Sequence, residues 1–90
     1  MSKKTLLEVY EQKYSDYVEK LNMLRTRITE QPETALLDEM LAHDEHVMMI
    51  GMIDFMLAAK VIGVLKYERL LNQLRDRELE FSNFFAEVTV

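Results

Sequence analysis

The segment 47–59, VMMIGMIDFMLAA, carries one charge, Asp54, in thirteen positions and leaves no polar face at helical spacing. A helix that is apolar all round must be covered on every side. Its cover can be the rest of the fold, a second copy of the chain, or lipid. The segment therefore predicts the most buried element of the chain and leaves these three kinds of cover open.

Amphipathic segments lie on both sides of this stretch. In 3–29, apolar residues recur at alternating spacings of three and four, the heptad pattern of a helix packed along others. They are Leu7, Tyr10, Tyr14, Tyr17, Leu21, Leu24 and Ile28. The segment 66–86 repeats helical spacing at Tyr67, Leu70, Leu71, Leu74, Phe81, Phe84 and Phe85.

The breaks between these segments are short. Pro32 cannot lie inside a helix, and Gly63 is suited to the left-handed residue that ends one. Two glycines and one proline in 90 residues leave little material for loops. We expect an all-α fold, a three-helix antiparallel bundle with helices at 3–29, 33–60 and 66–86, forming a single domain over 1–90.

Hydropathy alone makes 47–65 a candidate membrane span. Asp54 and Lys60 lie within it, and each costs about 2.5–3.5 kcal/mol at the centre of a membrane helix. The cost of these two charges favours a helix buried in a bundle over a membrane span. A small membrane protein remains an alternative.

Nearly half of the residues, 49%, are apolar, which is more than a domain of this size hides easily. We therefore expect a homodimer packed through the second helix. The predicted interface consists of Leu41, Met48, Met52, Phe55 and Met56. The predicted intrachain core on the same helix consists of Val47, Ile50, Leu57 and Val61.

Three polar residues are predicted to be buried: Asp54, Tyr10 and His43. Asp54 and His43 are eleven residues apart, close to three helical turns, so they share a face. A buried carboxylate needs a hydrogen-bonding partner. The antiparallel arrangement offers Tyr10 on the first helix or a group on the third.

The same region contains a weak metal motif. Glu39, His43 and His46 are spaced so that they share a helix face, and their side chains are ligand types that bind zinc or iron. The Glu-x-x-His spacing of di-iron bundles is missing. A metal-binding bundle is therefore only an alternative, and no cofactor is expected.

Composition excludes several function classes. The net charge of −5 disfavours direct nucleic-acid binding, and the chain has no cysteine, phosphate loop or nucleophile motif. We expect a cytoplasmic, non-enzymatic protein that self-associates and contacts a further protein partner. The alternative from a different class is a small acidic inhibitor or nucleic-acid mimic of phage or mobile-element type, which blocks a host enzyme.

Overall fold

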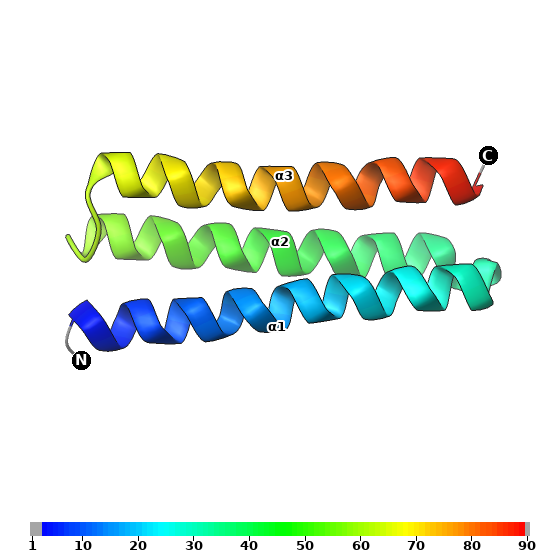
Figure 1. Cartoon of the computed structure of the whole chain (residues 1–90), viewed down its shortest axis with the longest axis horizontal. Coiled ribbons are helices and arrows are strands. Elements are labelled where there is room, and N and C mark those ends of the chain that lie inside the picture. The colour runs from blue at the N-terminus through cyan, green and yellow to red at the C-terminus, as the bar shows by residue number, and fades with distance from the viewer. Residues whose placement is uncertain (1–2, 90) are drawn as a thin grey trace.

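Three long helices, each antiparallel to the next, make up the computed structural model, which describes the backbone of residues 3–89 and the side chains of residues 5–89 (Figure 1). They are α1 (Lys3–Glu30), α2 (Ala35–Ala58) and α3 (Val64–Thr89). A short 3-10 turn, η1 (Pro32–Thr34), joins the first two. The all-α, three-helix architecture expected from the sequence is confirmed, although α2 ends two residues early and α3 is longer at both ends.

The helices form a somewhat flattened three-helix bundle, in which α1 and α3 also touch, for example where Arg77 Nε donates to the Tyr14 hydroxyl at 3.2 Å. Over Cα atoms the chain measures 43 × 21 × 14 Å, and α2 runs between α1 and α3 (Figure 1). α2 packs against both neighbours, whereas α1 and α3 contact each other less extensively. None of the described helices has the length and apolar content that crossing a bilayer requires.

The heptad residues of α1 supply one wall of the core. Tyr10, Tyr17, Leu24 and Ile28 are at most 3% exposed, and Leu21 is equally buried. From α3, the buried residues are Leu70, Leu74 and Phe81. The 3.5-residue spacing therefore predicted correctly which face of each outer helix turns inward.

α2 buries one face through a row that we call the inner seam. Its members are Ala35, Asp38, Ala42, His46, Met49, Ile53 and Met56. This corrects two predictions: Val47, expected in the core, is 52% exposed, and Met56, expected at the dimer interface, is 2% exposed. Ile50, Leu57 and Val61 are half-buried against the core. In an unbroken apolar run, only contacts with α1 and α3 decide which side is the inner one.

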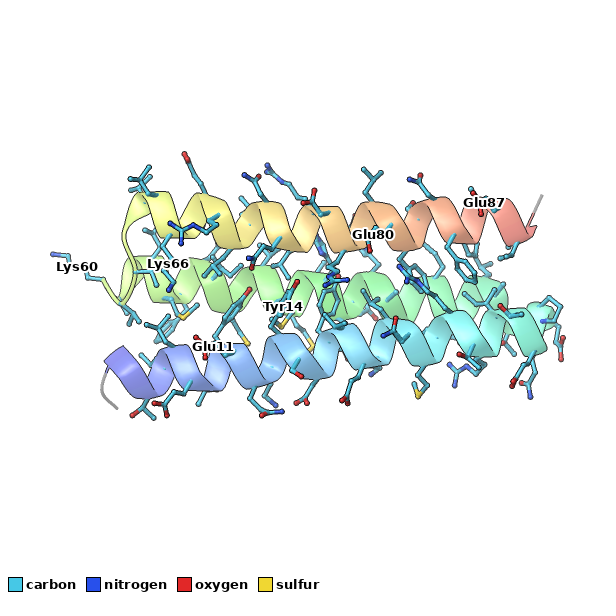
Figure 2. All side chains as sticks on the ribbon, in the orientation of Figure 1. Glu11, Tyr14, Lys60, Lys66, Glu80 and Glu87 are labelled. Carbon is cyan, nitrogen blue, oxygen red and sulfur yellow. The ribbon has the colours of Figure 1, made fainter. Side chains whose placement is uncertain are left out.

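The end of α2 differs from the prediction as well. Lys60, not Gly63, adopts the left-handed conformation, with φ at 60°. The Lys60 N–H donates to Leu57 O at 3.0 Å, and the Val61 N–H donates to Met56 O at 2.8 Å. These two bonds form the Schellman motif, which satisfies carbonyls at the helix end. The motif turns the chain so that Ile62 is buried, while Lys60 points away from the end of the bundle (Figure 2).

The α1–α2 connection is fixed by a buried carboxylate that the sequence analysis missed. The Asp38 side chain is 0% exposed, and the Arg27 guanidinium donates to its Oδ1, with Nε at 2.8 Å. Thr34 Oγ1 donates to Oδ2 at 2.9 Å. The hydrogen bonds from Arg27, followed by that from Thr34, hold the pKa of Asp38 below its ordinary value.

Candidate interaction surface

The side of α2 that faces away from its own core is almost entirely apolar. It carries a second heptad row, with alternating spacings of four and three, which we call the outer seam. Its members are Leu37, Leu41, Asp44, Met48, Gly51, Phe55 and Ala58. Leu37 is 56% exposed, Met48 64% and Phe55 59%, so large apolar side chains stand in solvent along the whole helix. Asp44 is the one charged member of this row.

A groove of about 680 Å³ runs between this side of α2 and α1. The apolar wall from α2 includes Met48, Met52 and Phe55, and α1 adds Leu6 and Val9. The polar groups of its lining are Lys13, Asp16, Tyr17, Lys20 and Glu45. Lys20 Nζ pairs with Glu45 Oε1 at 2.8 Å across the two helices. The groove is therefore an apolar strip bordered by charges of both signs.

The predicted interface residues divide among three environments. Met48 and Phe55 stand exposed on the outer seam, and Leu41 is half-buried in the same row. Met52 lines the groove while packing against the core. Only Met56 belongs wholly to the inner seam. The seam residues missed by the sequence analysis, such as Asp44 and Gly51, were detectable from the same 4-3 spacing.

Asp54 is exposed, contrary to the prediction, and its partner is not Tyr10. The Tyr67 hydroxyl of α3 donates to Asp54 Oδ1 at 2.8 Å. This hydrogen bond raises the pKa of Tyr67. Of the two partners considered, the third helix provides the contact because position 54 lies on the side of α2 that faces away from α1.

Tyr10 itself is 3% exposed, and its buried hydroxyl has no hydrogen-bonding partner among the described residues. Burial, with a smaller effect of Tyr14, raises the pKa of Tyr10 to about 12. The phenol therefore stays neutral across the physiological range. Its ring packs against Tyr14 with centroids 6.3 Å apart.

The buried histidine is His46, whereas His43, predicted to be buried, is exposed. His46 lies on the inner seam, with Nε2 2.6 Å from Glu78 Oε2 of α3 and Nδ1 3.4 Å from the Tyr17 hydroxyl. Burial lowers the pKa of His46, against the opposing effect of Glu78. Burial, followed by the charge of Glu78, raises the pKa of Tyr17 to about 12.

The weak metal motif is not assembled. Within residues 5–89, no three His, Asp or Glu side chains are grouped so that they could hold a metal ion. Glu39 and His43 border a small crevice, but His46 turns inward to Glu78. The alternative metal set of Glu39, His43 and His46 is therefore not brought together among the described residues, because the His46 ring is directed at Glu78 and Tyr17.

No protein-family model matches this chain, and searches of curated proteins and of solved structures find no significant match.

Proposed function

We propose that this chain is a non-enzymatic interaction protein that forms a homodimer through the outer seam of α2. The observation that supports this proposal is the exposure of Met48 and Phe55 in the middle of a continuous apolar row. Exposed apolar patches of this kind are typical of protein–protein interfaces. Methionine and phenylalanine are also among the residues enriched at interface cores.

The shape of the chain supports a partner over this face. A compact monomer of 10.7 kDa has an accessible surface of about 5,500 Å². The chain exposes 6055 Å², which is more than this, and large apolar side chains of α2 such as Met48 and Phe55 form part of that surface. Its broad face projects over 43 × 21 Å, roughly the 800 Å² per partner that a standard interface buries.

The occupant we propose is a second copy rather than a different protein. Apart from Asp44, the outer seam is apolar along its whole length, so it can cover itself when two copies meet. A self-complementary patch is what a two-fold dimer requires. A further protein partner would then bind the assembled dimer elsewhere.

Sedimentation velocity of the full chain at micromolar concentration tests the proposal. We expect a particle of twice 10.7 kDa for the wild type. Met48→Glu places a charge in the centre of the seam and should give monomers. Leu79→Glu, at a site on α3 that is 60% exposed, is the matched control and should remain dimeric. A monomeric wild type would overturn the homodimer and make the seam a surface for another protein.

A further inference from the structure

The outer seam is nearly symmetric about its central residue. Counting outwards from Met48, Leu41 is matched by Phe55 at seven residues on each side. The remaining pairs are Asp44 with Gly51 and Leu37 with Ala58, each centred within half a residue of the same point. In both of these pairs a larger side chain faces a small one.

We propose that the two α2 helices of the homodimer pair antiparallel about a two-fold axis at Met48, and that Asp44 of each copy forms an ion pair with the partner's Lys13. This inference rests on the homodimer proposed above. In this register Met48 contacts its own counterpart. Leu41 packs against the partner's Phe55, and Asp44 lies over the partner's Gly51. Every seam position from 37 to 58 is then covered.

Gly51 has no explanation within its own chain. A glycine inside a helix costs roughly 0.5–1 kcal/mol relative to alanine. Beyond the adjacent backbone of its own helix, a Cβ built on Gly51 would have no atom within 4 Å, so no contact with the rest of the chain requires its absence. A neighbouring backbone or side chain approaching from outside would require it. The partner's Asp44 occupies this place in the proposed register.

The charges on this face are complementary in the same register. Lys20 pairs with Glu45, and Arg27 pairs with Asp38. Residues of α1 and α2 that lie side by side along the bundle therefore have residue numbers that add up to 65. Lys13 is therefore level with Gly51 and Met52 and lines the same groove. When Asp44 lies over the partner's Gly51, the partner's Lys13 is the adjacent cation. Neither Asp44 nor Lys13 has an ion pair or hydrogen bond within the described chain.

Cysteine cross-linking tests the register, since the chain contains no cysteine of its own. A disulfide needs Cα atoms less than about 7 Å apart. Met48→Cys lies on the axis and should cross-link to itself under mild oxidation. Phe55→Cys should not, because the two copies of position 55 are 14 residues apart along the seam, about 21 Å. An equal mixture of Leu41→Cys and Phe55→Cys should form the mixed dimer.

Charge reversal tests the ion pair independently. Lys13→Glu and Asp44→Lys should each raise the dimer Kd about 3- to 30-fold, because the interface contains the pair twice. The double variant restores both pairs with reversed sign and should return to within about threefold of wild type. Asp76→Lys makes the same change of charge at an exposed site on α3 and should leave the Kd unaltered.

The outcomes separate this inference from the proposal on which it rests. If the wild type is a dimer but the Met48→Cys and Phe55→Cys variants each cross-link to themselves, the α2 helices are parallel. The proposed register would then be wrong, although the homodimer would stand. A dimer in which the double charge reversal fails to recover affinity would remove the Asp44–Lys13 pair. A monomeric wild type would overturn both.

Discussion

The Lys60→Gly variant is the sharpest test of how α2 ends. Lys60 has φ at 60°, a conformation that costs an L-residue roughly 1–2 kcal/mol because Cβ crowds the following carbonyl. Glycine removes that cost, but it also gives the unfolded chain more freedom, which offsets about 0.4–1 kcal/mol. We expect the variant to be more stable by roughly 0.5–1 kcal/mol. In a domain of this size that corresponds to a rise in Tm of roughly 2–8 °C.

Urea unfolding followed by circular dichroism gives the free energy directly. The midpoint should rise while the slope stays constant, because the buried surface is unchanged. Lys60→Ala is the matched control: it removes the same charge but keeps Cβ, and should stay close to wild type. All proteins are compared at one concentration, because self-association adds to apparent stability.

Gly63→Ala provides the opposing test. Gly63 has no positive φ, and a Cβ there would have no atom within 4 Å apart from those of its chain neighbours, so alanine should be tolerated. If Gly63 were instead the left-handed residue, the alanine variant would lose roughly 1–2 kcal/mol. A destabilised Gly63→Ala together with a destabilised Lys60→Gly would refute the Schellman end at Lys60.

Three further predictions concern the buried polar groups. Arg27→Met should destabilise the fold more than Asp38→Asn. The Arg27 variant leaves a fully buried carboxylate unpaired, whereas the Asp38 variant leaves a half-exposed guanidinium that water can still solvate. Equal losses of unfolding free energy in urea would contradict this prediction. Since the pKa of Asp38 is held below its ordinary value, its stabilisation should be present above about pH 4 and lost as the pH falls further. Burial lowers the pKa of His46, so the folded state resists its protonation and stability should decline as the pH falls below about 6.5. His46→Gln should flatten that decline, whereas His43→Gln, at an exposed site, should follow the wild-type curve.

The spacing of apolar residues was sufficient to predict which faces of α1 and α3 are buried. In α1 and α3 the apolar residues occupy one face at heptad spacing, and polar residues fill the rest. One orientation of each helix therefore buries the apolar face, and Leu24 and Leu74 lie where this spacing places them. Pro32, through its fixed φ and missing N–H, also determined the first break.

The same spacing could not predict which face of α2 is buried, because this helix is apolar all round. Two heptad rows compete there, and the sequence does not state which one faces the chain's own core. Contacts with α1 and α3 select the row that contains His46 and Met56, and this choice leaves Met48 and Phe55 in solvent.

The segment 47–59 by itself determined that α2 must be covered on all sides, because no apolar helix is stable in water with its surface bare. Only the tertiary structure decided how much of that cover the chain supplies. In the three-helix bundle, α1 and α3 cover the inner seam of α2 and leave its outer seam open. The polar exceptions follow from the same geometry: Asp38 and His46 point inward to partners on α1 and α3, while Asp54 points outward to Tyr67.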